Sequence, residues 1–220
     1  MEVPSRIVAR VGTPRGELVL RRAGDGVELI SNGTFLMDTS DGRSERLLVE
    51  AALGRHDAPH DVLLGGLGVG FSLLAALSDT RVRRVTVAEI EPALVEWHAS
   101  HLRPFSRGAI DDPRVRILVG DLAVHLATAA SSYDAVCLDV DNGPDWTVTD
   151  GNSALYDEAG TRLVVSALRP GGLLSVWSAN ASPEYEARLR HHLDEVTALE
   201  VPVSRGEPDV VYVGRRRGLS

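Results

Sequence analysis

Short apolar runs separated by polar turns make up the first part of the chain. The runs are Ile7–Ala9, Glu17–Leu20, Val27–Ile30 and Thr34–Met37. Glycine-containing turns such as Asn32-Gly33 separate them, and short runs joined in this way are typical of β-hairpins. Residues 1–43 are therefore predicted to form a small antiparallel β-meander.

The spacing of apolar residues then changes to that of a helix. Leu47, Leu48, Ala51 and Ala52 recur at helical spacing, and Ser44 stands where an N-cap residue would stand. A first helix beginning at Ser44 is predicted.

Strand-like runs alternate with helical stretches along the rest of the chain. The strand and helix pairs are 61–64 with 71–77, 84–88 with 92–102, 115–119 with 122–128, and 135–138 with 154–168, followed by a strand at 173–176, a helix at 183–192 and strands at 198–203 and 209–213. This alternation is typical of right-handed βαβ crossovers and of a mainly parallel sheet covered on both faces. The last two runs predict an antiparallel hairpin at the edge of that sheet.

The fold class predicted from this pattern is α/β. A chain of 220 residues, 44% of them hydrophobic, is long enough for one buried core and short for two. We expect a single domain, built on a Rossmann-like, doubly wound, mainly parallel sheet over residues 44–220. The small N-terminal β-meander of residues 1–43 is expected to belong to the same domain.

Charge and cysteine content narrow the classes of partner. The formal net charge is −8, and such a field repels a nucleic-acid backbone, so nucleic acid is not expected as a partner. Arg215–Arg217 is interpreted as a solvated terminus. The single cysteine, Cys137, has no second cysteine with which to form an internal disulfide.

No targeting or membrane segment is recognisable in the sequence. Met1–Arg6 lacks the apolar core of a signal peptide, and no stretch reaches the roughly 18 unbroken apolar residues of a membrane span. We therefore expect a cytoplasmic protein that acts on a small-molecule substrate and has no membrane partner. Whether it forms a homodimer stays open.

A glycine-rich turn follows the first strand of the expected parallel sheet, where residues 65–70 read G-G-L-G-V-G. Glycine permits a tight turn and lets a ligand reach backbone N–H groups at a helix N-terminus. The candidate cofactor-binding residues of this turn are Gly65, Gly66, Gly68 and Gly70. A dinucleotide fingerprint counted from Gly66 would need a further glycine where Phe71 stands, so the spacing disfavours NAD.

Acids follow the next two strands, at the edge where ligands bind in such sheets. Glu89 stands about 20 residues beyond the glycine turn, the separation at which a carboxylate accepts both hydrogen bonds of a ribose diol. Asp121 is placed to take the exocyclic amine of adenine, to act as a helix N-cap, or to do both. Their neighbours Ile90 and Leu122 complete the expected cofactor contacts. Glu91 is interpreted as a solvated acid of the first helical turn.

Three acids gather in the loop after the fourth strand. Acids at the carboxyl end of a buried strand are better explained by a site than by folding, because burying charge without a partner is costly. One carboxylate there can bind a cationic sulfonium or amine while another orients or deprotonates a nucleophile. The aromatic rings of Trp146 and Tyr156 could form walls of the acceptor pocket. The candidate catalytic residues are Asp139, Asp141 and Tyr156, and the candidate substrate contacts are Asp145 and Trp146.

Several of these stretches resemble the class I S-adenosylmethionine-dependent methyltransferase superfamily and, within it, the spermidine synthase-like branch. The stretches are L-L-G-G-L-G-V-G at 63–70, V-A-E-I-E-P at 87–92, V-R-I-L-V-G-D at 115–121, Y-D-A-V-C-L-D at 133–139, L-Y at 155–156 and L-R-P-G-G at 168–172. The resemblance implies that Glu89 holds the ribose and Asp121 contacts adenine. It also implies that Asp139 occupies the position of the amine-activating aspartate of aminopropyltransferases.

Three departures from that branch concern the chemistry. Gly68 stands where the G-G-G-D-G-G turn of aminopropyltransferases carries an acid, the loop at 139–145 lacks the D-S-S-D-P run, and Arg43-Ser44-Glu45 stands in place of Tyr-His-Glu. Without an acid at position 68, the turn can accept the α-carboxylate of intact S-adenosylmethionine. We therefore expect a methyltransferase that uses S-adenosylmethionine and acts on a small-molecule acceptor by in-line displacement.

Two alternatives stay open. The first is aminopropyl or related alkyl transfer from decarboxylated S-adenosylmethionine to an amine, because the acids at 139, 141 and 145 make an anionic pocket. The second is a non-catalytic cofactor-binding subunit.

Overall fold

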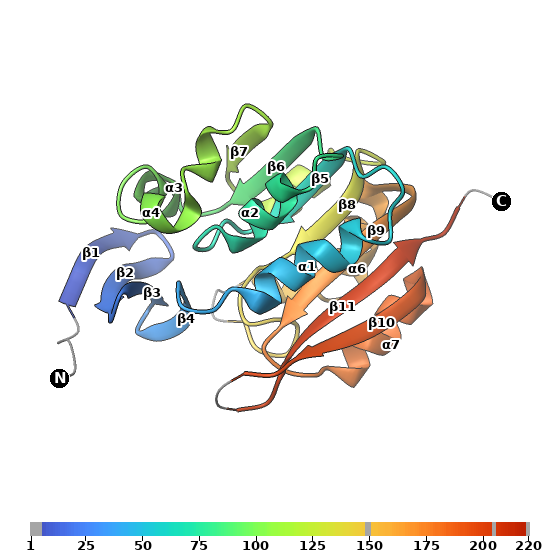
Figure 1. Cartoon of the computed structure of the whole chain (residues 1–220). Coiled ribbons are helices and arrows are strands. Elements are labelled where there is room, and N and C mark those ends of the chain that lie inside the picture. Colours follow the sequence, from blue (N-terminus) through green and yellow to red (C-terminus); the bar gives the residue numbers. More distant parts are fainter. Residues whose placement is uncertain (1–5, 148–150, 204–205, 219–220) are drawn as a thin grey trace.

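The computed structural model describes residues 6–147, 151–203 and 206–218, which are organised around two β-sheets (Figure 1). The strands of the N-terminal sheet are β1 (Arg6–Thr13), β2 (Gly16–Ala23), β3 (Gly26–Ser31) and β4 (Thr34–Asp38), paired antiparallel in that order. The predicted meander is confirmed. Most of the segment on which the signal-peptide prediction rests, residues 1–5, lies outside the described residues.

The second sheet has seven strands in the order β10-β11-β9-β8-β5-β6-β7. They are β5 (Asp61–Gly65), β6 (Arg84–Glu89), β7 (Val115–Val119), β8 (Tyr133–Leu138), β9 (Leu168–Ser178), β10 (Leu193–Val201) and β11 (Asp209–Arg216). Strands β5 to β9 run parallel, and β11 pairs antiparallel with both β9 and β10. The α/β fold with its antiparallel edge hairpin is confirmed. Residues 204–205, within the predicted turn of that hairpin, lie outside the described residues.

Helices cover both faces of the seven-stranded sheet. They are α1 (Arg43–Leu53), α2 (Phe71–Ser78), α3 (Pro92–His98), α4 (Arg103–Ser106), η1 (Ala109–Asp111), α5 (Leu122–Leu126), η2 (Asn152–Leu155), α6 (Glu158–Ala167) and α7 (Pro183–His192). Side chains of α1 and α2 join one hydrophobic cluster, and those of α5, α6 and α7 join another. Successive residues of a strand point to opposite faces, so Leu64 belongs to the first cluster and Leu63 to the second. No helix of the described ranges is both long enough and apolar enough to cross a membrane.

Helix α1 is not capped by Ser44. Gly42 occupies the N-cap position without a side-chain hydrogen bond, and Ser44 lies buried in the first turn, where its hydroxyl donates to Glu45 Oε2 at 3.0 Å. The predicted cap is wrong because the serine is already helical and its hydroxyl serves a buried carboxylate instead of a free backbone N–H.

The helix predicted over 92–102 is shorter than expected. Helix α3 ends at His98, and residues 99–102 form a turn in which the Leu102 N–H donates to the carbonyl of Trp97 at 2.8 Å. Helix α4 begins at Arg103, beyond the predicted range, with Pro104 in its first turn, where the missing N–H of proline costs no helical hydrogen bond.

Helix α6 starts later than its apolar pattern indicated. The Asp157 side chain accepts a hydrogen bond from the Gly160 N–H at 2.7 Å and caps the helix, which therefore begins at Glu158. Residues 152–155 form the separate turn η2.

The basic run near the C-terminus is largely part of the fold. Arg215 and Arg216 belong to β11, and the guanidinium group of Arg215 donates to the carbonyl oxygens of Gly171 at 3.0 Å and Arg55 at 2.8 Å. The interpretation as a solvated terminus is wrong for these residues, because their side chains satisfy carbonyl groups of neighbouring loops.

The N-terminal sheet packs beside α3 (Figure 1). Leu20 and Leu29 of this sheet share a hydrophobic cluster with Val69 of the glycine turn and with Leu94 and Trp97 of α3. The cluster fixes strands β2 to β4 next to the loops that follow β5 and β6. The assignment of residues 1–43 and 44–220 to a single domain stays a prediction.

Candidate active site

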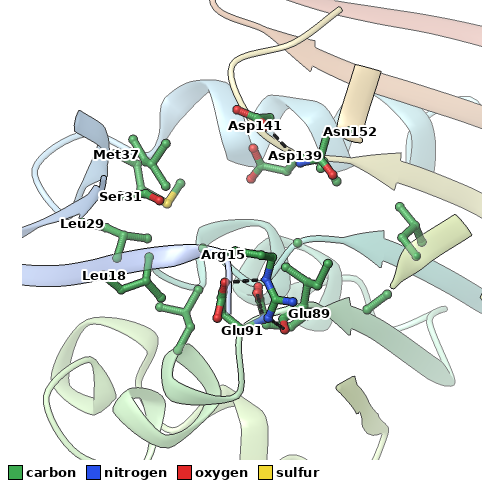
Figure 2. A pocket seen from close by; sticks show the side chains of 18 of the residues that line it. Arg15, Leu18, Leu29, Ser31, Met37, Glu89, Glu91, Asp139, Asp141 and Asn152 are labelled. Carbon is green, nitrogen blue, oxygen red and sulfur yellow. Dashed lines mark hydrogen bonds and ion pairs between the residues drawn. The ribbon is translucent and has the colours of Figure 1, made fainter. Parts of the chain in front are cut away.

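The order of the strands reverses between β5 and β8, and a pocket opens there (Figure 2). The N–H of Asp139, just after β8, donates to the carbonyl of Gly65, the last residue of β5, at 2.8 Å. The space between the lining residues amounts to about 1140 Å³, with the open solvent at the mouth of the pocket included. Such a reversal is the usual ligand position in open parallel sheets.

The glycine turn after β5 forms one side of the pocket. Gly66 and Gly68 line it, whereas Gly65 ends β5 and Gly70 is the N-cap residue of α2. Gly66 has a φ of 94°, and a Cβ there would lie 2.3 Å from the carbonyl oxygen of Asp139. A side chain at this position would push the ends of β5 and β8 apart, so glycine is required.

Glu89 links the glycine turn to the loop after β6. Its Oε2 accepts from the N–H of Leu67 at 2.9 Å, and its Oε1 accepts from the N–H of Glu91 at 2.8 Å. Burial raises the pKa of Glu89, and these two backbone hydrogen bonds lower it. Each carboxylate oxygen has a second lone pair, and Glu89 lines the pocket. Ribose binding by Glu89 stays a prediction. The structure adds that the two backbone hydrogen bonds hold the carboxylate in place at the surface of the pocket.

Glu91 is not the solvated acid that its place in the sequence indicated. It is 9% exposed and lines the pocket. Arg15, from the turn between β1 and β2, donates through Nε to Glu91 Oε1 at 2.6 Å and through Nη2 to the carbonyl of Ile90 at 2.7 Å. The Thr13 hydroxyl donates to the same Glu91 oxygen at 3.2 Å. The first hairpin of the N-terminal sheet is therefore fastened to the loop after β6.

Asp121 borders the pocket on the β7 side. Its Oδ1 accepts from the Ala123 N–H at 2.7 Å, which confirms the predicted N-cap of α5. The residue is exposed and lines the pocket together with Leu122 and Ile90. Contact of Asp121 with adenine stays a prediction.

Asp139 lies near a second acid, Glu45, from the first turn of α1. The hydroxyl of Ser72, in the first turn of α2, is 3.2 Å from Asp139 Oδ2 and 3.3 Å from the carbonyl oxygen of Glu45. Both acids line the pocket, and Glu45 is only 7% exposed. Two helices and one strand end thus bring two carboxyl groups to the same part of the pocket.

The electrostatic surroundings of these two acids favour proton exchange near neutral pH. Burial, together with the smaller effects of the charges of Asp139 and Asp209, raises the pKa of Glu45 to about 7. Burial raises the pKa of Asp139 to about 6, against the hydrogen bond from Ser72, which lowers it. A group that takes a proton from a nucleophile works best with a pKa in this range.

Replacing Glu45 by glutamine is expected to flatten the dependence of stability on pH. A buried acid whose pKa is raised to about 7 keeps its proton up to a higher pH in the folded state than in the unfolded state. The free energy of unfolding therefore falls as pH rises from the ordinary carboxyl pKa through the folded-state value. When the pH rises from about 5 to about 8, the free energy of unfolding of E45Q should fall by about 2 kcal/mol less than that of the wild type. Urea unfolding at both pH values measures this. The control is Glu50→Gln, an exposed substitution in the same helix, whose free energy of unfolding should fall with pH as much as that of the wild type. If the fall in E45Q equals that of the wild type, the prediction is wrong.

Asp141 also lines the pocket, and its neighbours orient its carboxylate. The Asn152 side chain donates to Oδ2 at 2.9 Å, and the backbone N–H of Asn142 donates to Oδ1 at 3.2 Å. Asp141 has a φ of 63°, a conformation in which aspartate is tolerated better than most residues. The loop after β8 is thus bent so that this acid faces the pocket (Figure 2).

Three predicted residues lie away from the pocket. Tyr156 is 2% exposed, its hydroxyl donates to the carbonyl of Val140 at 2.5 Å, and its ring packs edge-on against Tyr185. Trp146 is 53% exposed and Asp145 is exposed, and neither is among the described residues that line the pocket. Tyr156 does not form a wall of the pocket, because its ring is buried and its hydroxyl takes a backbone partner beneath the loop. Contact of Asp145 and Trp146 with the substrate stays a prediction.

Tyr156→Phe is expected to act on stability and only weakly on turnover. The variant leaves the Val140 carbonyl without its buried partner, which costs about 1–2 kcal/mol of unfolding free energy. We expect kcat to fall less than about tenfold, because the hydroxyl positions the loop and does not touch the pocket. Denaturant titration and steady-state kinetics measure the two effects. A loss of about a thousandfold in kcat at unchanged stability would instead indicate a direct part in the reaction.

Gly68 faces the N-terminal sheet and not open space. A Cβ at Gly68 would lie 2.7 Å from Sδ of Met37, in β4. The carbonyl of Gly68 is held 2.9 Å from Nε2 of the buried His98. At the position where the G-G-G-D-G-G turn of aminopropyltransferases carries an acid, a side chain would therefore meet Met37.

Sequence reasoning missed residues that reach the pocket from other elements. The largest omissions are Arg15, Glu45, Asn152 and the apolar residues of β2 to β4. Glu45 had a recognisable signal, because it keeps the glutamate of the Tyr-His-Glu pattern. Arg15 had none, because it lies 76 residues from its partner Glu91 in the sequence.

Comparisons with known proteins agree with this geometry. A sequence model described as the spermine/spermidine synthase domain matches residues 43–203. Polyamine aminopropyltransferase 2 of Pseudomonas aeruginosa is 36% identical over 156 residues, which are 69% of this chain and 43% of that protein. Polyamine aminopropyltransferase of Aeropyrum pernix is 30% identical over 182 residues, 81% of this chain and 57% of that protein. The chain thus spans about half the length of these two relatives.

Solved structures share the fold at low sequence identity. A spermidine synthase in complex with the transition state analogue AdoDATO superposes with a TM-score of 0.81 at 18% identity, over 96% of this chain and 73% of that chain. Spermidine synthase from Thermotoga maritima gives a TM-score of 0.80 at 18% identity, over 96% and 72%.

Proposed function

Because the chain belongs to the spermine/spermidine synthase family, we propose that it transfers an aminopropyl group from decarboxylated S-adenosylmethionine to the nitrogen of a small amine. The observation that carries this proposal is the charge of the pocket. Six acids line it against one arginine among the described residues: Glu45, Glu89, Glu91, Asp121, Asp139 and Asp141, against Arg15. Such a pocket attracts a cationic sulfonium and an amine.

The proposed donor fits the pocket from the β6 and β7 side. Glu89 would accept hydrogen bonds from the ribose diol, and Asp121 would accept one from the adenine amine. Ala88, Leu122 and Leu155 supply apolar surface for the base. This arrangement directs the sulfonium toward the acids at the end of β8.

In the proposed reaction the amine nitrogen attacks the carbon of the aminopropyl group that is bonded to sulfur. The new C–N bond forms as the C–S bond breaks, and the electron pair of that bond stays on sulfur, giving a neutral thioether. The ammonium that results loses a proton to Asp139, whose raised pKa suits proton acceptance. Glu45 and Asp141 stabilise the positive charge of donor and acceptor during approach.

The expectation of methyl transfer is not supported. It rested on the missing acid at position 68, but six other acids line the pocket. An intact donor would also bring its carboxylate toward Asp139 and Glu45, where like charges repel. The relatives reported above carry the name aminopropyltransferase.

A comparison of two donors tests the proposal. The protein is incubated with decarboxylated or intact S-adenosylmethionine and a mixture of small amines, and the nucleoside products are quantified. Formation of 5′-methylthioadenosine from the decarboxylated donor should exceed consumption of the intact donor by at least about a hundredfold, which corresponds to a discrimination of about 2.8 kcal/mol or more. Formation of S-adenosylhomocysteine from the intact donor would favour methyl transfer. No product from either donor would favour a non-catalytic subunit.

A further inference from the structure

His98, the last residue of α3, is a buried side chain to which the proposed reaction gives no part. Nε2 of its ring lies 2.9 Å from the carbonyl oxygen of Gly68, in the glycine turn. Because a carbonyl oxygen can only accept a hydrogen bond, Nε2 carries the proton and donates. Gly68 lines the pocket, so His98 is joined to the pocket through this one residue.

The second ring nitrogen of His98 has no comparable role. Burial lowers the pKa of His98, so the ring is neutral near pH 7 and Nδ1, which carries no proton, can only accept. Among the residues that the structure describes, no donor meets Nδ1. A buried polar atom without a partner lowers stability by at least as much as one neutral hydrogen bond adds. Stability alone therefore gives no reason for a histidine at this position.

The glycine turn, in contrast, needs a restraint from outside. Gly66, Gly68 and Gly70 have φ values of 94°, 50° and 99°, and glycine has more conformational freedom to lose than any other residue. The N–H of Gly70 donates to the carbonyl of Leu67 at 3.0 Å. Within the described ranges, the bond to His98 is the only hydrogen bond of Gly68. The middle of the turn is thus held from α3.

The ring of His98 is itself held in a fixed place. A Cβ at Gly70 would lie 3.0 Å from Cε1 of His98 and 2.9 Å from Cβ of Ser106, so the ring packs closely against the turn. Leu94 and Trp97 of the same helix belong to the hydrophobic cluster that also contains residues of the N-terminal sheet. Such packing leaves little room for another rotamer. The donor of the hydrogen bond is therefore as rigid as the helix that carries it.

We propose that His98 is a positioning residue for the donor, which holds the Gly68 carbonyl and thereby keeps the glycine turn in the shape that receives the nucleoside. His98 acts through Gly68 and does not touch the reacting atoms, so it sets donor affinity and leaves the transfer step unchanged. This inference rests on the proposed aminopropyl transfer and adds to it a residue outside the pocket.

Two variants of similar size separate the hydrogen bond from the bulk of the ring. In His98→Gln the amide nitrogen can take the place of the imidazole Nε2, whereas His98→Met has a side chain of the same length without a donor. H98M should bind 5′-methylthioadenosine about tenfold more weakly than H98Q by calorimetry, the usual effect of one hydrogen bond. The KM for the decarboxylated donor should rise by the same factor while kcat stays within about threefold. H98Q should stay within about threefold of the wild type in all three quantities.

Hydrogen exchange and urea unfolding distinguish positioning from a general structural role. The N–H of Gly70 should exchange at least about fivefold faster in H98M than in H98Q, with exchange unchanged in β5 and β8. The free energy of unfolding of H98M should equal or exceed that of H98Q, because the methionine removes the unpaired Nδ1. His98→Asn, whose amide is too short to reach Gly68, should behave like H98M and provides a second variant. The control is His101→Gln, an exposed substitution that should change none of these quantities.

The outcomes separate this inference from the proposed function. If H98M and H98N bind the nucleoside as tightly as H98Q, the role of His98 is wrong and aminopropyl transfer stands. The same conclusion holds if the variants lose affinity only in proportion to a loss of stability, or if kcat falls as far as KM rises. If the wild type binds the nucleoside with the expected difference between variants but transfers no aminopropyl group, the proposed function fails and the role of His98 in nucleoside binding stands. If the wild type binds no nucleoside, both proposals fail.

Discussion

Replacing Asp139 by asparagine is expected to lower kcat for amine alkylation about a thousandfold, within the range found when a general base is removed. The asparagine keeps the size of the side chain and its place beside Ser72, but it cannot take the proton that the attacking nitrogen releases. The change removes a buried negative charge, so the folded state should be at least as stable as the wild type at about pH 8. The expected result for D139N is therefore a large fall in kcat with no fall in the free energy of unfolding.

Two measurements make the Asp139 result specific. Binding of 5′-methylthioadenosine, followed by calorimetry, should change less than about threefold, because the nucleoside contacts lie with Glu89 and Asp121. Asp209→Asn is the matched control, since Asp209 contributes to the same acidic field without being among the described pocket-lining residues. It should keep more than about a tenth of the wild-type kcat. A D139N enzyme as active as D209N would exclude Asp139 as the proton acceptor.

Replacing Glu89 by glutamine is expected to weaken binding of 5′-methylthioadenosine about a hundredfold. Each carboxylate oxygen of Glu89 accepts a backbone N–H, one from Leu67 and one from Glu91. In glutamine one of these oxygens is replaced by an NH₂ group. This group is a hydrogen-bond donor, so it repels the backbone N–H that it meets and cannot accept a hydrogen bond from the ribose. Losing the charge-assisted hydrogen bonds from the ribose diol to the carboxylate accounts for about 3 kcal/mol of binding free energy.

The control for Glu89 is Asp121→Asn. Asp121 is exposed, and asparagine retains the oxygen that caps α5, so nucleoside binding should weaken less than about tenfold. Calorimetric titration with 5′-methylthioadenosine gives both values. If the two variants weaken binding equally, the ribose is held elsewhere and the assignment of Glu89 has to be abandoned.

The fold was predictable because its periodic pattern is local. The buried strands β5 and β8 contain the apolar runs V-L-L at 62–64 and A-V-C-L at 135–138, and a glycine turn follows the first and an acid the second at the ligand edge. These features depend on neighbours in the sequence, so the strand alternation and the position of the pocket could be inferred. The exact helix starts could not, because they depend on caps such as that of Asp157, which apolar spacing does not show.

The contents of the site were less predictable, because several side chains arrive from distant segments. Arg15 reaches Glu91 only because the first hairpin packs beside α3. The sequence shows that position 68 lacks a carboxylate, but it does not show that a side chain there would meet Met37 of the other sheet. The same applies to Tyr156, which is near the acids in sequence although its hydroxyl serves the backbone of Val140.

The two sheets divide the pocket between them in a way that bears on how such a protein diversifies. Apart from Arg15 and Ser31, the described lining residues that come from the first 43 positions are apolar, and all the described lining acids come from later positions. Substitutions in the meander can therefore reshape the pocket without removing any of these acids. The shape of the pocket and its charge are thus open to change independently of each other.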